Sequence, residues 1–231
     1  MRFISERGGY TMIERPDNRS YKLRGDRQTL AQENAYKRSW SKYGIELLGT
    51  IEPAQLFPDS STHIMEIGTG MGEGSALIAQ QFPEIGFIGV EVHRPGVGAL
   101  LGHIERLGLK NLHLMEEDAH IILRNHFKDG AFDGFHLYFP DPWPKRRHWK
   151  RRIVQPEFLA LIHSKLKSGG YIHIATDWVP YAEWIEGVFN ESSLFEGGRI
   201  DRPEWRPLTK FEGQGIRKGH VVNDLKYFKK D

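Results

Sequence analysis

The sequence contains no cysteine. Disulfide bonds, catalytic thiolates and zinc sites with cysteine ligands are therefore excluded, and such a chain suits a reducing compartment. It also has no hydrophobic run of about 20 residues, the length with which a helix crosses a bilayer. The N-terminus mixes charged residues with glycine and lacks the apolar core of a signal peptide. We therefore expect a cytoplasmic globular protein.

A large excess of one charge is also missing, because 32 Lys and Arg residues face 30 Asp and Glu residues. Any affinity for nucleic acid must therefore come from a local patch. A length of 231 residues allows one well-buried domain with a tail. Residues 1–30 are polar and basic without a sustained hydrophobic period. We predict a flexible basic arm there and a single domain over residues 31–231.

Metal-binding patterns are absent as well. The eleven histidines include no pair at the i, i+4 spacing of a helical zinc site, and the sequence offers no cysteine to complete another kind of zinc site. We therefore expect no catalytic metal.

The most distinctive stretch reads F-P-D-P-W-P-K-R-R-H-W-K-R-R over residues 139–152. Because proline has no N–H and restricts the residue before it, the prolines around Asp141 end a strand and fix one carboxylate at its tip. The following basic residues would repel one another unless an anion such as a polyphosphate chain meets them, and a solvated surface loop is the alternative. Trp143 and Trp149 resemble platforms for stacking bases, with packing on the domain edge as the alternative.

A glycine-rich turn lies near the start of the domain. Residues 63–67 are typical of a buried strand, residues 75–82 of a helix and residues 86–92 of a second strand. The turn between the first strand and the helix reads E-I-G-T-G-M-G, and Glu91 lies near the end of the second strand. Glycines let the backbone approach a nucleotide-like ligand, and a carboxylate at a strand end can accept ribose hydroxyls.

The spacing of these glycines favours one kind of cofactor. A dinucleotide fingerprint needs G-x-G-x-x-G, and neither Gly68 nor Gly70 begins one. The order E-x-G-x-G-x-G instead resembles the first motif of class I S-adenosylmethionine-dependent methyltransferases. Glu66 would be unfavourable beside a pyrophosphate but suits a cationic methionine moiety. We predict cofactor binding here, with a structural tight turn as the alternative.

The rest of the domain alternates helices and strands. We predict helices over residues 29–43, 95–107, 119–127, 155–166 and 179–189, and strands over 111–115, 132–139, 171–175 and 219–228. Ligands of open α/β sheets bind beyond the carboxyl ends of the strands. The acidic residues that follow the strands should therefore converge on one rim: Glu66, Glu91, Asp118, Asp141 and Asp177. Asp118 is equally suited to cap the next helix.

Five motifs together resemble the bacterial tRNA (guanine-N7-)-methyltransferases: E-I-G-T-G-M-G (66–72), G-V-E-V-H-R-P-G-V-G (89–98), the stretch over 139–152, A-T-D-W (175–178) and T-K-F-E (209–212). The resemblance implies a Rossmann-like class I methyltransferase fold, which is α/β with a mostly parallel seven-stranded sheet and helices on both faces. It implies transfer of the methyl group of S-adenosylmethionine to N7 of guanine 46 in the tRNA variable loop. Trp149 departs from the family pattern, and residues 1–30 match nothing in it.

The resemblance also assigns residues by role. It implies that the cofactor is held by Glu66, Gly68, Gly70, Glu91, Asp118, Ala119 and Asp141, of which Asp141 is also the catalytic residue. It implies that the substrate is contacted by Lys145, Asp177, Thr209, Lys210, Phe211 and Glu212. Further contacts to RNA fall to Arg147, His148, Trp149, Lys150, Arg151 and Arg152. The expected partner is tRNA, and the protein is a monomer or a homodimer.

The implied reaction needs no general base, because guanine N7 carries an exposed lone pair and no proton at neutral pH. Positioning and electrostatics are then the main tasks. We expect Asp141 and Asp177 to hold the base and to stabilise the charge that develops on it. Proton abstraction by Asp141 is the minority alternative.

Three other functions remain open at this point. The first is methyl transfer to an exocyclic amino group of adenine or cytosine, although Asp141-Pro142-Trp143 lacks the second proline of the turn those enzymes use. The second is a nicotinamide-dependent oxidoreductase, which the glycine spacing disfavours. The third is an RNA-binding protein without activity, against which the intact acidic residues argue.

Overall fold

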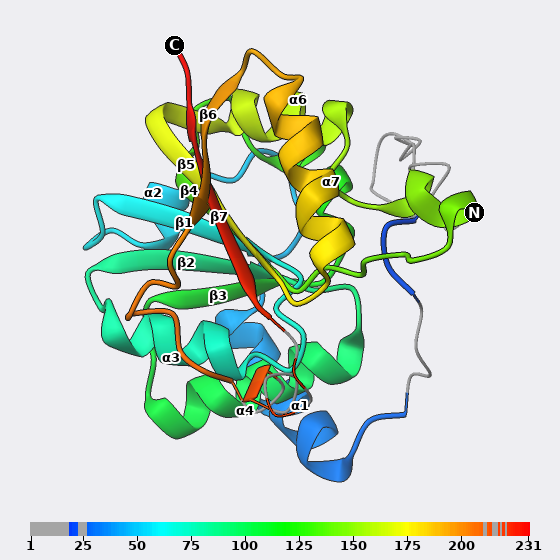
Figure 1. Ribbon diagram of the computed structural model, residues 1–231. Helices are drawn as coiled ribbons and strands as arrows, with labels where there is room; N and C mark the ends of the chain where they lie inside the picture. Colours follow the sequence, from blue (N-terminus) through cyan, green and yellow to red (C-terminus); the bar gives the residue numbers. More distant parts are fainter. Residues whose placement is uncertain (1–18, 23–26, 210–211, 214–216, 218, 220) are drawn as a thin grey trace.

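The computed structural model describes residues 19–22, 27–209, 212–213, 217, 219 and 221–231. Its centre is a seven-stranded sheet in the order β3-β2-β1-β4-β5-β7-β6 (Figure 1). The strands are β1 Thr62–Ile67, β2 Ile85–Val90, β3 Leu112–Met115, β4 Phe132–Tyr138, β5 Leu166–Thr176, β6 Phe195–Ile200 and β7 Asn223–Lys229. β1 to β5 pair in parallel, whereas β7 is antiparallel to β5 and β6. The predicted α/β fold with a mostly parallel sheet is confirmed.

Helices cover both faces of this sheet. They are α1 Leu30–Tyr43, α2 Pro53–Leu56, α3 Glu73–Gln81, α4 Arg94–Leu107, α5 Ala119–His126, the 3-10 helix η1 Arg146–Arg151, α6 Pro156–Lys165 and α7 Val179–Asn190. One buried cluster contains side chains of α1, α3 and α4, and the other contains side chains of α5, α6 and α7. The sheet therefore has two hydrophobic layers, as expected for a doubly covered parallel sheet. None of the described helices combines the length and hydrophobicity that crossing a bilayer requires.

The central strands are buried because their residues face helices on both sides. β1 is buried at every position after Thr62, and β2 at every position after Ile85. Such strands appear in the sequence as continuous apolar runs and not as an alternating pattern. The predicted strands at residues 63–67 and 86–92 are confirmed on this basis, with ends shifted by one or two residues.

Local capping interactions and a proline set the ends of two helices. Thr29 accepts a hydrogen bond from the Gln32 N–H, and the Gln32 side chain accepts one from the Thr29 N–H, which is a capping box. α1 ends at Tyr43, one residue before Gly44. α3 ends at Gln81, before Pro83, because proline cannot continue the helical hydrogen bonds.

Two features of the C-terminal half were predicted incorrectly. We expected the fifth strand to begin at residue 171, but β5 already begins at Leu166, which pairs with Phe132 of β4. β6 was not predicted at all, because only Phe195 of its residues is buried. Its place depends on pairing with β7, where a side chain at Gly197 would lie 2.2 Å from the Lys226 carbonyl oxygen.

The predicted N-terminal arm lies largely outside the described residues. Residues 19–22 are described, and they contact the segment around Asp141 and Trp143.

Candidate active site

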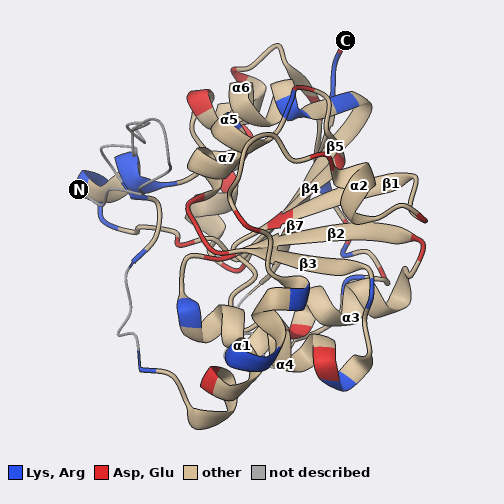
Figure 2. Cartoon of the chain, turned by 180° about the vertical axis from the view of Figure 1, so that it is seen from behind, with Lys and Arg blue, Asp and Glu red and all other residues tan. Residues whose placement is uncertain are grey.

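A cavity of about 460 Å³ opens where β1, β2 and β4 end. This volume lies within the range of about 300–1,000 Å³ that is usual for small-molecule sites. All seven residues predicted to hold a cofactor line it: Glu66, Gly68, Gly70, Glu91, Asp118, Ala119 and Asp141. Figure 2 shows several acidic residues together at this end of the sheet, between α1 and α7. Four of the five acidic residues expected on one rim therefore line one cavity, namely Glu66, Glu91, Asp118 and Asp141, whereas Asp177 does not line it.

The glycine-rich turn exposes backbone to the cavity. Gly70 has φ +58°, and a Cβ built on it would meet no atom within 4 Å. Gly72 has φ +77°, and its Cβ would lie 2.5 Å from the Leu100 side chain. A left-handed conformation favours glycine at both positions, and close packing on α4 excludes any side chain at the second. The turn therefore supplies a rigid wall of main-chain atoms.

Glu66 lies near the end of β1, and its carboxyl group is almost completely buried. Burial, with a smaller contribution from the nearby Glu91 carboxylate, raises the pKa of Glu66 to about 7. A cation in the cavity would favour the ionised form of this group. Glu66 thus has the environment of a residue that pairs with a positively charged ligand.

Glu91 directly follows β2 and is oriented by backbone N–H groups. Its Oε1 accepts hydrogen bonds from the N–H groups of Val92 and His93, both at 2.8 Å. Its Oε2 accepts one from the Gly70 N–H at 2.7 Å. Burial raises the pKa of Glu91, against the effect of these hydrogen bonds. A carboxylate has about four acceptor positions, so one of them stays available to a ligand hydroxyl.

Asp118 has both of the roles considered for it. It caps α5, since its Oδ1 accepts the His120 N–H at 2.8 Å, and it also lines the cavity beside Ala119.

Asp141 lies on a segment whose backbone is strained. Phe139 has φ +51° and Trp143 has φ +43°, and residues other than glycine rarely adopt such positive φ angles. The Phe139 N–H donates to the Ala175 carbonyl at 2.7 Å and so ties the segment to β5. Strain of this kind persists only where surrounding contacts hold it, and it is concentrated at functional sites.

The described part of the N-terminal arm supplies some of those contacts. The Trp143 Nε1–H donates to the Ser20 carbonyl at 2.9 Å, and the Lys22 N–H donates to Asp141 Oδ2 at 3.2 Å. Ser20, Tyr21 and Lys22 also line the cavity. No feature of the sequence indicated that this part of the arm contributes to the site.

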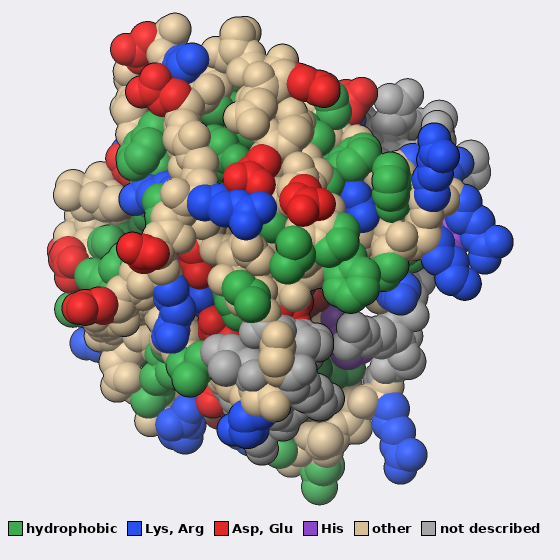
Figure 3. Space-filling model, in the orientation of Figure 1, with side chains coloured by type: hydrophobic (Ala, Val, Ile, Leu, Met, Phe, Trp, Pro, Cys, Tyr) green, Lys and Arg blue, Asp and Glu red, His purple; other side chains and the backbone are tan. Residues whose placement is uncertain are grey.

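The basic run after Asp141 forms η1 and is mostly exposed. Figure 3 shows Lys and Arg side chains gathered on the side of the molecule where η1 projects in Figure 1. The exposed members are Lys145, Arg146, Arg147, Lys150 and Arg151, while the His148 side chain is half-buried against Trp143. None of these residues lines the cavity, so the basic surface lies next to it.

Arg152 differs from its neighbours and does not fit the predicted contact with RNA. It is only 3% exposed, and its Nε–H donates to the Pro142 carbonyl at 2.9 Å. Its guanidinium lies 4.8 to 5.0 Å from the rings of Trp149, Tyr181 and Trp184. Arg152 therefore fixes the Asp141 segment to α7 and is not placed to meet a phosphate.

The tryptophans of the basic run also pack against the protein. Trp143 is 4% exposed, and half-buried Trp149 lies 5.5 Å from the Trp184 ring. The alternative of packing on the domain edge is thus confirmed for both. Of the six tryptophans, all within the described residues, only Trp178 is exposed, at 39%. It follows Asp177 after β5, and neither residue lines the cavity.

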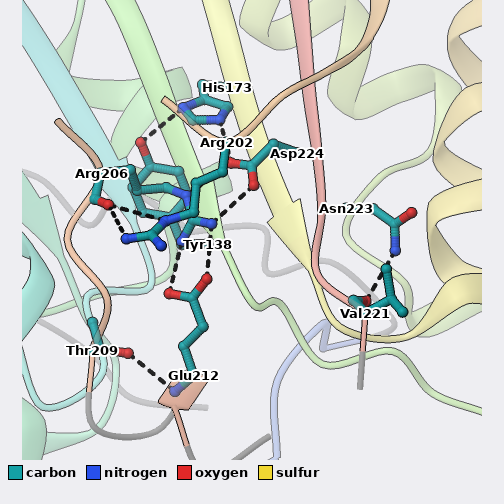
Figure 4. Close-up of polar contacts among 9 residues, drawn as sticks. All are labelled: Tyr138, His173, Arg202, Arg206, Thr209, Glu212, Val221, Asn223 and Asp224. Carbon is teal, nitrogen blue, oxygen red and sulfur yellow. Dashed lines mark hydrogen bonds and ion pairs between the residues drawn. The ribbon is translucent and has the colours of Figure 1, made fainter. Parts of the chain in front are cut away.

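A buried ionic network lies behind the C-terminal wall of the cavity (Figure 4). Its centre is Arg206, which lines the cavity and which sequence reasoning missed. Arg206 forms ion pairs with Glu212 and with Asp224 of β7. Glu212 is 2% exposed, so this predicted substrate contact is occupied by protein. Thr209 lines the cavity, and Lys210 and Phe211 lie outside the described residues.

The described residues contain no group of three or more His, Asp and Glu side chains arranged to hold a metal ion.

The chain is similar to known methyltransferases over most of its length. Residues 60–225 match the model of the family described as "Putative methyltransferase". The tRNA (guanine-N(7)-)-methyltransferase of Nitrosomonas europaea is 47% identical over 220 residues, which cover 93% of this chain and 97% of that protein. The chain belongs to the tRNA (guanine-N(7)-)-methyltransferase family. The family members of Streptomyces avermitilis and Neisseria meningitidis are 46% and 45% identical, over 90% of this chain and 73% and 89% of theirs.

Solved structures agree with the fold of this family. The 16S rRNA methyltransferase KamB superposes with a TM-score of 0.57 at 16% identity, covering 77% of this chain and 92% of KamB. The aminoglycoside resistance methyltransferase NpmB1 gives a TM-score of 0.52 at 16% identity, over 76% and 91% of the two chains. These likenesses support the class I methyltransferase fold alone.

Proposed function

We propose that this chain is an S-adenosylmethionine-dependent tRNA (guanine-N7-)-methyltransferase that modifies guanine 46 of the variable loop. The observation that carries the proposal is the adjacency of one carboxylate-lined cavity, a strained segment that presents Asp141, and an exposed basic helix. The family members named above support the tRNA substrate. Such a substrate is met in the bacterial cytoplasm.

The cavity fits S-adenosylmethionine. Gly68 and Gly70 leave the backbone open to a nucleoside, and Glu91 offers a carboxylate oxygen at the ribose position. Glu66 is a buried carboxyl group that a cationic ligand would ionise. When bound, the cofactor supplies an electrophilic methyl group on a sulfonium centre.

Asp141 is the proposed catalytic residue, and its task is electrostatic. As guanine N7 accepts the methyl group, the purine becomes positive and its N1–H becomes more acidic. A fixed carboxylate beside the base then stabilises the transition state more than the ground state. The strained backbone holds Asp141 at the cavity mouth, so little reorganisation is needed during the reaction. N7 carries no proton, so no step requires a general base.

Asp177 and Trp178 are proposed to seat the base and its neighbours. They lie at the end of β5, where the Phe139 N–H also joins the Asp141 segment to β5. Trp178 has a rigid backbone, because its carbonyl accepts the N–H groups of Tyr181 and Ala182 in the first turn of α7. α7, which Trp178 precedes, packs on η1 through Trp184 and Trp149, and an exposed aromatic ring combined with a basic groove is typical of sites for unpaired nucleotides. Trp178 thus takes the stacking role that the sequence suggested for Trp143 and Trp149.

The backbone of the tRNA is proposed to lie on η1. Lys145 is the first basic residue after Asp141 in the sequence, and we assign it to the substrate nucleotide. We assign Arg147, Lys150 and Arg151 to phosphates. Arg152 and Trp149 are left out of this set because of their burial against α7.

Methylation of unmodified tRNA tests the proposal. The protein is incubated with S-adenosylmethionine carrying a labelled methyl group and with a tRNA transcript, and the labelled nucleotide is then mapped. We expect 7-methylguanosine at position 46 and no label in a transcript with adenine at that position. A methylated exocyclic amino group, or label elsewhere in the tRNA, would support a different base methyltransferase.

A further inference from the structure

Arg206 is held in a double ion pair that is almost fully closed to solvent. Its Nη1 and Nη2 donate to the two carboxylate oxygens of Glu212 at 3.0 and 2.9 Å. Its Nε and Nη2 donate to the two oxygens of Asp224 at 2.8 Å each. Both contacts are bidentate, a geometry that the planar guanidinium of arginine allows and that lysine cannot form. One side chain thus joins Glu212 to strand β7.

The network continues from β7 to the wall of the cavity. The His173 Nε2 lies 2.8 Å from Asp224 Oδ1, and its Nδ1 lies 3.0 Å from the Tyr138 hydroxyl. Burial lowers the pKa of His173, against the effect of the Asp224 carboxylate, which raises it. A neutral ring with hydrogen on Nε2 donates to Asp224 and accepts from the Tyr138 O–H. Tyr138 and Arg206 both line the cavity.

The other end of the network joins Glu212 to Thr209. Thr209 Oγ1 accepts the Glu212 N–H at 3.2 Å, and the Thr209 carbonyl accepts the Gly213 N–H at 2.9 Å. T-x-x-E is the sequence of a capping box, but here the Glu212 side chain binds Arg206. The Thr209 methyl lies 3.2 Å from the Cβ position of Gly74, at the start of α3. Thr209 therefore closes the cavity wall against the glycine-rich turn.

We propose that Arg206 is a positioning residue that locks Thr209 and Glu212 to β7, and that Glu212 acts through Arg206 and does not touch the guanine. This inference rests on the proposed function, within which Glu212 would otherwise be a substrate contact. The cavity wall formed by Arg206, Pro207 and Thr209 is kept in place by the lock. Losing the lock disturbs the cofactor cavity itself, before any RNA is bound.

Cofactor binding without RNA separates the two roles of Glu212. We would measure the affinity for S-adenosylhomocysteine by calorimetry in Glu212→Gln, which keeps the shape of the side chain but removes its charge. If Glu212 positions the wall, the affinity falls by about tenfold or more. If Glu212 contacts the guanine, the affinity in the absence of RNA is unchanged and only the KM for tRNA rises, which would overturn the proposal.

A matched control is available elsewhere in the chain. Glu186 of α7 also forms a bidentate pair with an arginine, since Arg199 Nε and Nη2 donate to it at 2.9 and 2.6 Å. This pair is partly exposed and does not line the cavity. Glu186→Gln should bind S-adenosylhomocysteine as the wild-type protein does.

A double-mutant cycle tests whether Glu212 and Arg206 act as one unit. If they do, adding Arg206→Lys to Glu212→Gln weakens cofactor binding little beyond the larger single effect. Effects that multiply would show independent roles and overturn the proposal. Loss of the cooperative unfolding transition in Glu212→Gln would also overturn it, since the pair would then support the whole fold.

Measurements on the wild-type protein distinguish a failure of the positioning role from a failure of the proposed function. A wild-type protein that binds S-adenosylhomocysteine and methylates tRNA, together with an unaffected Glu212→Gln variant, refutes only the positioning role. A wild-type protein that binds no S-adenosylhomocysteine refutes the proposed function.

Discussion

The two sides of the cavity are built in different ways. The cofactor side consists of strand ends and the glycine-rich turn, where Glu66 and Glu91 are placed by β1 and β2. The substrate side, which also supplies one wall of the cofactor cavity, consists of segments without regular structure or with short helices, and single side chains hold them. Arg152 fixes the Asp141 segment and Arg206 fixes the segment that contains Thr209. Topology therefore positions Glu66 and Glu91, whereas long-range side-chain contacts position Asp141 and the cavity wall that contains Arg206 and Thr209.

Asp141→Asn should have the largest effect of the variants considered, and it should affect methyl transfer and not cofactor binding. The variant keeps the size of the side chain but loses the charge that stabilises the methylated base, so we expect kcat to fall by about 100-fold. The affinity for S-adenosylhomocysteine should stay within about twofold, because Glu66 and Glu91 carry the cofactor side. Single-turnover kinetics and calorimetry measure the two effects.

Asp201→Asn, at an exposed position, is the control for this substitution. Weaker cofactor binding with an unchanged methyl-transfer rate in Asp141→Asn would place Asp141 on the cofactor side and break the comparison.

Trp178→Ala should weaken tRNA binding and leave the cofactor side intact. Loss of one base–aromatic stack costs about 1–3 kcal/mol, so we expect the Kd for tRNA to rise by about 5- to 100-fold. Trp178→Phe should recover most of the affinity, because phenylalanine also offers a flat ring. Equal tRNA binding by the alanine variant and the wild-type protein would remove Trp178 from the substrate side.

Glu66 predicts a pH dependence that belongs to the cofactor side. The pKa of Glu66 is about 7 in the folded protein against 4.5 without burial, so the folded state binds more protons between these values. The free energy of unfolding from this group therefore falls as pH rises through that window. A sulfonium ligand favours the ionised form, and we expect affinity for S-adenosylmethionine to rise by up to about tenfold between roughly pH 6 and 8. Calorimetry at several pH values measures this affinity, and the rise should be absent in Glu66→Gln. A rise of the same size in the variant would show that another group causes it.

The smallest expected effects are those of replacing Arg151 or Arg152, and they distinguish a contact with RNA from a contact within the protein. Arg151 is exposed, so Arg151→Ala should flatten the salt dependence of tRNA binding by about 0.7–0.9 log units per lost phosphate contact. Arg152→Ala should leave the salt slope unchanged and lower the thermal stability, because it leaves the Pro142 carbonyl without its buried donor. Filter binding measures the salt slope, and thermal denaturation measures the stability. A changed salt slope in Arg152→Ala together with an unchanged slope in Arg151→Ala would contradict this assignment.

The same division explains what the sequence could predict. The strands of the cofactor side are continuous apolar runs, and the glycine spacing follows directly from the needs of a turn beside a ligand. The rim residues Glu66, Glu91 and Asp141 were therefore identified correctly as neighbours. Membership of the tRNA (guanine-N(7)-)-methyltransferase family was also indicated by the motifs.

Residues of the substrate side could not be sorted in this way. Arg151 and Arg152 are identical in type and adjacent, and only the packing of α7 makes one exposed and the other buried. Arg206 has partners 6 and 18 residues away, and one of them lies on a strand whose pairing the sequence does not reveal. β6 likewise depends on β7 for its existence as a strand.

The central claim is that N7 of one guanine in tRNA attacks the methyl group held in this cavity. The most direct test is a tRNA in which guanine 46 is replaced by 7-deazaguanine, where a C–H group stands in place of N7. We predict that this tRNA accepts no methyl group but competes with normal tRNA at an unchanged Kd, because the basic helix and Trp178 still bind it. Methylation of the 7-deazaguanine tRNA at the normal rate would contradict the account.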